Sequence, residues 1–84
     1  MNVDKILKKA KNNPQNIRFT EMKKLIEAFG YRYRGGKGSH CVYKHDGIIE
    51  IMNLQEEKGM AKVYQVKDFL KVLEKYNLQR MEGK

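Results

Sequence analysis

The residues best suited to chemistry in this chain lie in one short run that ends at His40. The run reads Gly-Gly-Lys-Gly-Ser-His and contributes Lys37, Gly38 and Ser39. Glycine permits positive φ angles and close approach of the backbone to a ligand, and a lysine beside free backbone N–H groups suits a phosphate. Histidine titrates near neutral pH and can move a proton during catalysis. The run therefore predicts an anion-binding turn beside a proton acceptor, as RNA cleavage requires.

His40 is the candidate general base or acid of such a reaction. A neutral imidazole would take the proton of a ribose 2′-hydroxyl while that oxygen attacks the adjacent phosphate. Lys37 and the N–H groups of the turn would stabilise charge on the phosphate, and Ser39 would orient it. Against this, a lone histidine at the start of a strand is more often structural or merely exposed. A serine in a turn also often bonds its own backbone.

Further cations lie on the segments expected to surround His40. Arg32, Arg34 and Lys44 would form a positive surface that holds phosphates without reading bases. The Tyr-Arg-Tyr-Arg alternation is equally typical of an ordinary half-buried strand with solvated arginines. A formal net charge of +8 over 84 residues nevertheless favours a polyanionic partner, either nucleic acid or an acidic protein surface.

Several other site classes are not expected. His40 and His45 have opposite parity on one strand and should point to opposite faces, so they predict no shared metal site. The Gly36–Ser39 segment lacks the spacing of a nucleotide-binding loop, and no cofactor is expected. The single cysteine, Cys41, fits a reducing cytoplasm. No apolar run approaches the roughly 20 residues of a membrane span.

The periodicity predicts one α+β domain with helix-strand-strand-strand-helix order and an extra N-terminal helix. The three strands should form an antiparallel meander, with two helices on one face and the other face open. Thr20 is the expected N-cap of the first main helix, and Gly30 should follow its last turn. The expected elements are helices over 2–12, 20–29 and 65–76, strands over 31–34, 40–45 and 48–53, and a loop over 54–62. The domain should span 17–78, preceded by a helical extension over 1–16 and followed by a flexible tail over 79–84.

This pattern resembles the HicA family of toxins from bacterial and archaeal HicA–HicB systems. The resemblance spans about residues 17–78, and its most specific piece is Lys37-Gly38-Ser39-His40 through Tyr43. It implies a fold like that of double-stranded-RNA-binding domains, and a ribosome-independent mRNA endoribonuclease with His40 as its catalytic histidine. It also implies a HicB-like antitoxin as partner. Met52-Asn53-Leu54-Gln55 stands where many members carry a proline and a histidine after the third strand.

Two other functions fit the same residues. The first is a noncatalytic module that binds double-stranded RNA by shape and phosphate contacts and does not need an imidazole at position 40. The second is a protein-interaction domain whose positive face docks an acidic partner. The extension over 1–16 is a candidate for contacts in a homodimer or with the antitoxin.

Overall fold

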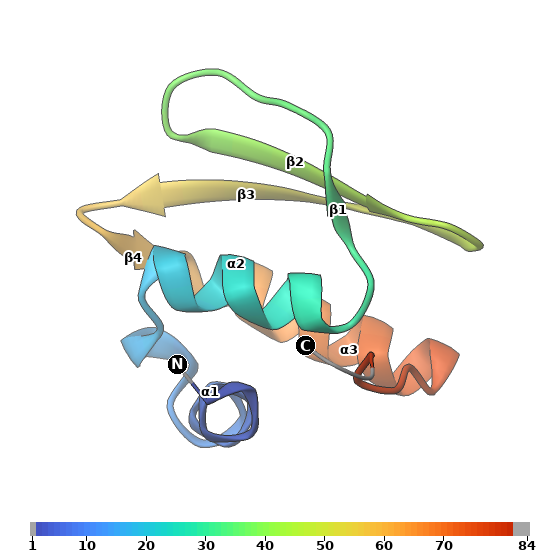
Figure 1. Cartoon of the computed structure of the whole chain (residues 1–84). Coiled ribbons are helices and arrows are strands. Elements are labelled where there is room, and N and C mark those ends of the chain that lie inside the picture. The colour runs from blue at the N-terminus through green and yellow to red at the C-terminus, as the bar shows by residue number, and fades with distance from the viewer. Residues whose placement is uncertain (1, 82–84) are drawn as a thin grey trace.

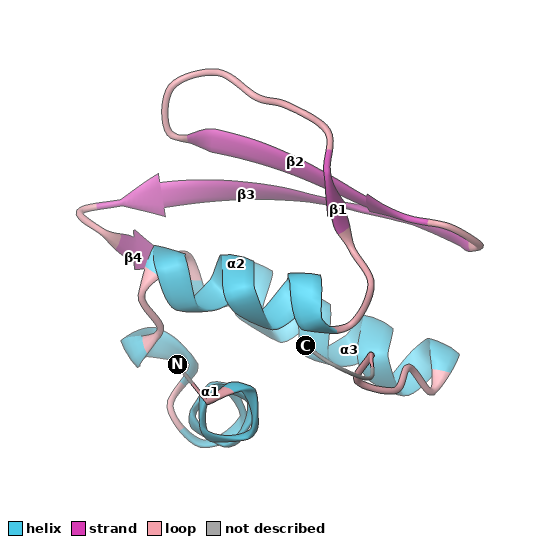
Figure 2. Cartoon of the chain, in the orientation of Figure 1, coloured by secondary structure: helices cyan, strands magenta, loops and turns pink. Residues whose placement is uncertain are grey.

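The computed structural model describes residues 2–81 and contains three α-helices and a four-stranded antiparallel sheet with the order β1-β2-β3-β4. Helices α2 and α3 lie beneath one face of the sheet, whereas the other face is open (Figures 1 and 2). The expected α+β class and one-sided helix packing are confirmed, but the sheet has one strand more than the meander predicted. The elements are α1 (Val3–Asn12), a 3-10 turn η1 (Pro14–Asn16), α2 (Phe19–Ala28), β1 (Arg32–Tyr33), β2 (His40–His45), β3 (Ile48–Glu57), β4 (Met60–Ala61) and α3 (Val63–Tyr76).

The expectation of a loop over residues 54–62 is wrong. Strand β3 continues to Glu57, and β4 then pairs back onto its end. Lys58 and Gly59 join the two strands with φ angles of +53° and +81°, as a two-residue turn of the hairpin type requires. The charged residues at this end of the strand concealed it, because a strand in an antiparallel sheet with one open face needs only one apolar face.

Helix α2 begins one residue before Thr20, so the predicted N-cap is wrong. Arg18 precedes the helix, and the Glu21 carboxylate accepts a hydrogen bond of 2.9 Å from the Arg18 backbone N–H. Phe19 is already helical because its side chain is buried in the core, where tertiary packing outweighs local capping preference. At the other end Gly30 has a φ of +99°, which confirms its expected place after the last turn.

Helix α1 packs into the same core as the rest of the chain. Val3, Ile6 and Ala10 are buried and belong to one continuous apolar cluster that extends to the sheet. Arg80 forms an ion pair with Asp4 at 2.7 Å, so the C-terminal segment returns to α1. Residues 82–84 of the expected flexible tail lie outside the described residues.

Two tyrosines of the sheet region belong to the core rather than to a nucleic-acid surface. Tyr31 and Tyr43 are buried, and their hydroxyls donate to the Glu50 carbonyl and the Glu27 carboxylate at 2.9 and 2.8 Å. Burial is the main cause that raises the pKa of Tyr31 to about 12, and the nearby charge of Glu50 adds to it.

None of the helices within residues 2–81 is long and apolar enough to cross a membrane.

Candidate functional site

His40 is the first residue of β2, and its side chain is exposed at the rim of the sheet. It pairs with Gln55 of β3, whereas its neighbour Cys41 pairs with Leu54, which is buried against the helices. Because side chains alternate along a strand, His40 belongs to the open face of the sheet. The stretch that departs from the HicA pattern therefore lies within β3, directly beside His40.

The glycine turn packs closely against His40. The His40 N–H donates to the Lys37 carbonyl at 3.0 Å, and the Ser39 carbonyl accepts from Glu56 N–H at 2.9 Å, which fixes the start of β2 on β3. A Cβ on Gly36 would collide with the His40 carbonyl. Among residues 2–81, no group bonds the backbone N–H of Lys37, Gly38 or Ser39, so these donors are available to an anion.

The predicted phosphate contacts lie at increasing distances from His40. Lys37, Gly38 and Ser39 belong to the turn itself, and the Arg34 N–H bonds the Val42 carbonyl at 2.7 Å, two residues along β2. Arg32 pairs with Lys44 at the far end, about 13 Å from His40 at the rise of a β-strand. Arg32 also forms an ion pair with Asp46. The open face thus carries a positive strip, formed by Arg34, Arg32 and Lys44, that begins beside His40.

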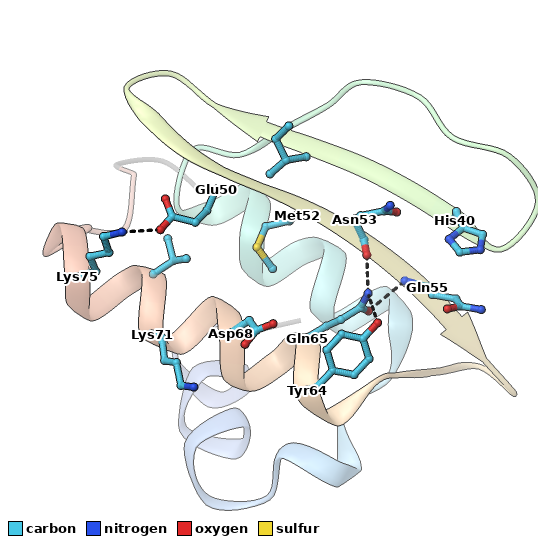
Figure 3. A pocket seen from close by; sticks show the side chains of 12 residues that line it. His40, Glu50, Met52, Asn53, Gln55, Tyr64, Gln65, Asp68, Lys71 and Lys75 are labelled. Carbon is cyan, nitrogen blue, oxygen red and sulfur yellow. Dashed lines mark hydrogen bonds and ion pairs between the residues drawn. The ribbon is translucent and has the colours of Figure 1, made fainter.

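A groove of about 490 Å³ lies between β3 and α3, and His40 stands at one end of it (Figure 3). Asn53 and Gln55 line the groove from β3, and Tyr64 and Asp68 line it from α3. The sequence predicted none of these four as a site residue, although Asn53 and Gln55 belong to the stretch that departs from the HicA pattern. The alternation of polar Asn53 and Gln55 with apolar Met52 and Leu54 was the available signal for a strand. No pattern within the neighbouring sequence predicted that α3 would lie alongside β3.

The opposite end of the groove is closed by an interaction between β3 and α3. The Glu50 carboxylate accepts from Lys75 Nζ at 2.8 Å and from the Tyr76 hydroxyl at 2.6 Å. The hydrogen bond from Lys75, and to a smaller extent that from Tyr76, lowers the pKa of Glu50 from 4.5 to about 2. Glu50 is therefore ionised throughout the physiological pH range, and its hydrogen bonds link β3 to α3.

Gln65 supports the groove from beneath. It is a buried polar side chain, and its amide bonds both the Gln55 N–H, at 3.0 Å, and the Asn53 carbonyl. One side chain thus satisfies two backbone groups on the edge of β3 that no neighbouring strand pairs. Asn53 and Gln55 are held in place by this contact while their own amides remain in the groove lining.

His45 has a structural role on the other face of the sheet. Its Nδ1 and Nε2 atoms lie 2.8 and 3.0 Å from the carbonyl oxygens of Asp46 and Phe29, and its ring packs edge-on against Tyr31. The ring also approaches Gly30 so closely that a Cβ there would lie 2.6 Å from Nε2. His45 therefore links β2 to the end of α2 and takes no part in the site around His40.

The arrangement around His40 combines a proton acceptor, available N–H donors and a positive strip, which together suit acid–base chemistry on a phosphate diester. Residues 2–81 contain no group of three or more His, Cys, Asp or Glu side chains placed to hold a metal ion.

Comparison of the chain with protein-family models, with curated proteins and with solved structures finds no match.

Proposed function

We propose that this protein is a metal-independent endoribonuclease that cleaves mRNA with His40 as general acid or base. The observation that carries the proposal is the position of His40, which is exposed where the glycine turn, the positive strip and the groove meet. An imidazole at such a place can reach a bound phosphate diester from the solvent side. The net charge of +8 favours an RNA substrate over a neutral one.

The chemistry needs only groups that the chain supplies. Neutral His40 accepts the proton of a ribose 2′-hydroxyl while the 2′-oxygen forms a bond to the adjacent phosphorus. The bond from phosphorus to the 5′-oxygen breaks, and that oxygen takes a proton from water, which leaves a cyclic phosphate and a 5′-hydroxyl. The hydroxide that remains takes the proton from His40 and restores the neutral imidazole. Lys37 and the N–H groups of Gly38 and Ser39 stabilise the charge on the phosphate oxygens.

The wider proposal is that the chain acts as the toxin of a type II toxin–antitoxin system similar to HicA–HicB. Its support is the Lys37–His40 motif together with the order α2-β1-β2-β3-β4-α3 from Phe19 to Tyr76, which is the expected helix-strand-strand-strand-helix order with the short strand β4 added. In this proposal the fold is that of a double-stranded-RNA-binding domain, the protein acts in the cytoplasm, and a HicB-like antitoxin covers the open face. Such a partner would need an acidic surface to match the positive strip.

Cleavage of a labelled mRNA by the purified protein in excess chelator tests the proposal. His40→Gln should lower the rate by about 10²–10⁴-fold while the circular dichroism spectrum and melting temperature remain unchanged. Lys24→Ala, which removes one exposed charge from α2, serves as the control and should cleave at the wild-type rate. Expression without antitoxin should arrest growth only when His40 is present.

Two results would reject the nuclease. One is equal cleavage by wild type and His40→Gln, which would assign the activity to another group or a contaminant. The other is intact RNA combined with duplex-selective binding that is indifferent to residue 40. That second result would identify the noncatalytic double-stranded-RNA-binding module instead.

A further inference from the structure

We propose that the groove between β3 and α3 binds one unpaired guanine base of the RNA whose backbone passes His40. The inference rests on the proposed function, because it uses His40 as the point where the scissile phosphate lies. It adds a base-binding site to the phosphate-binding surface, formed by Tyr64 and Asp68 on α3 with Asn53 and Gln55 on β3.

Tyr64 provides the stacking surface. Its side chain is 58% exposed in the first turn of α3, at the same end of the groove as Gln55 and His40 (Figure 3). An exposed aromatic ring beside a nucleic-acid backbone tightens the binding of an unstacked base by about 5–150-fold. Bases inside a duplex do not offer their faces, so this surface selects single-stranded RNA.

Asp68 provides the group that reads the edge of the base. It lies one helical turn beyond Tyr64 and projects into the space between α3 and β3 (Figure 3). Its carboxylate has no hydrogen-bond or ion-pair partner among residues 2–81. A carboxylate accepts two parallel N–H bonds, and guanine presents two such donors side by side, at N1 and at its 2-amino group. Adenine, cytosine and uracil each present a single N–H group at this edge.

The charges of the groove favour a base over a phosphate. Asp68 and Glu50 bring negative charge into the groove, and Lys75 is bound to Glu50. Lys71 also lines the groove, but its amine points away from β3 (Figure 3). The phosphates therefore remain at Lys37 and the positive strip, while the neutral base enters between β3 and α3.

The first experiment measures equilibrium binding of fluorescent hexanucleotides to His40→Gln protein, so that no RNA is cleaved. A uridine hexamer with one central guanosine should bind at least about tenfold more tightly than the same sequence in a duplex. Adding Tyr64→Ala should weaken binding of the single strand about tenfold, whereas Tyr64→Phe should retain it. Tyr33→Ala is the matched control, because Tyr33 is 56% exposed and lies outside the groove.

The second experiment tests the base edge with the central guanosine replaced by inosine, which lacks the 2-amino group, or by adenosine. The guanosine hexamer should bind about tenfold more tightly than either replacement. Asp68→Asn should remove this preference without weakening the adenosine hexamer. Glu74→Gln, which makes the same change on α3 outside the groove, should leave the preference intact.

The outcomes separate this site from the proposed nuclease. Guanosine-dependent binding without any cleavage by wild type would support the base site and reject the nuclease. Cleavage that depends on His40 but is indifferent to Tyr64 and Asp68 would reject the base site alone. Binding of free guanosine monophosphate as tightly as the hexamer would also overturn the inference, because the site would then belong to a mononucleotide.

Discussion

The backbone of Gly36 packs directly against the carbonyl oxygen of His40 and leaves no room for a Cβ atom. Two hydrogen bonds fix the same turn. The His40 N–H donates to the Lys37 carbonyl within the turn, and the Glu56 N–H donates to the Ser39 carbonyl across the sheet. The glycine-rich run thus has a structural function beside the phosphate binding that we propose for it. It brings the turn close enough to β2 to set where His40 begins the strand.

Gly36→Ala should therefore displace His40. The added methyl group must push the turn away from β2, and overpacking of this kind costs about 1–3 kcal/mol. We expect reduced RNA cleavage and shifted His40 ring resonances in NMR spectra. Gly47→Asn in the turn between β2 and β3 is the control, because position 47 has a φ of +81° and open space and asparagine tolerates a positive φ. Wild-type cleavage by Gly36→Ala would show that the close packing does not position the histidine.

Lys37→Ala and Arg34→Ala should weaken RNA binding by similar factors for every sequence tested. Each removes one proposed contact to phosphate, so the slope of log binding constant against log salt should flatten by about 1 per variant. Binding titrations between 50 and 300 mM salt, roughly spanning the physiological range, measure this slope. Lys8→Ala on the exposed face of α1 should leave it unchanged. A sequence-dependent loss would instead place Lys37 or Arg34 on a base.

Gln65→Leu should destabilise the protein through the edge of β3. The substitution leaves the Gln55 N–H and the Asn53 carbonyl without their partner, and an unsatisfied buried polar group costs about 1–3 kcal/mol. Urea denaturation measures the loss, and amide hydrogen exchange should accelerate at Gln55. Gln79→Leu, at an exposed position, is the comparison. Unchanged exchange at Gln55 would mean that water replaces the Gln65 amide at no cost.

Glu50 should contribute to the acid sensitivity of the fold. Its pKa is lowered from 4.5 to about 2 by hydrogen bonds from Lys75 and then Tyr76, so the unfolded state binds the proton more readily. The stabilisation is therefore complete above pH 4.5 and is lost as the pH falls toward 2. The urea midpoint of Glu50→Gln should fall less than that of wild type across this window. Parallel curves for the two proteins would contradict the assignment, and Glu74→Gln should reproduce the wild-type curve.

Local patterns were reliable wherever one element alone decides the outcome. The apolar face of Met22, Leu25, Ile26 and Phe29 is buried as its spacing predicts. Gly30 ends α2 because only a residue that tolerates positive φ can do so. Thr20 shows the limit of this reasoning, since burial of Phe19 moves the start of the helix against the local capping preference.

The helical faces, the α+β class, and the run of Lys37, Gly38 and Ser39 before His40 can be read from the sequence alone, because these features depend on residues close together in the chain. The extension of β3 to Glu57, the pairing of Gln55 with His40 and the groove beside α3 come from long-range packing. Strand pairing and helix packing join residues far apart in sequence, and the chain order carries no signal for such contacts. The environment of His40 is therefore a property of the fold, whereas its chemical type is a property of the sequence.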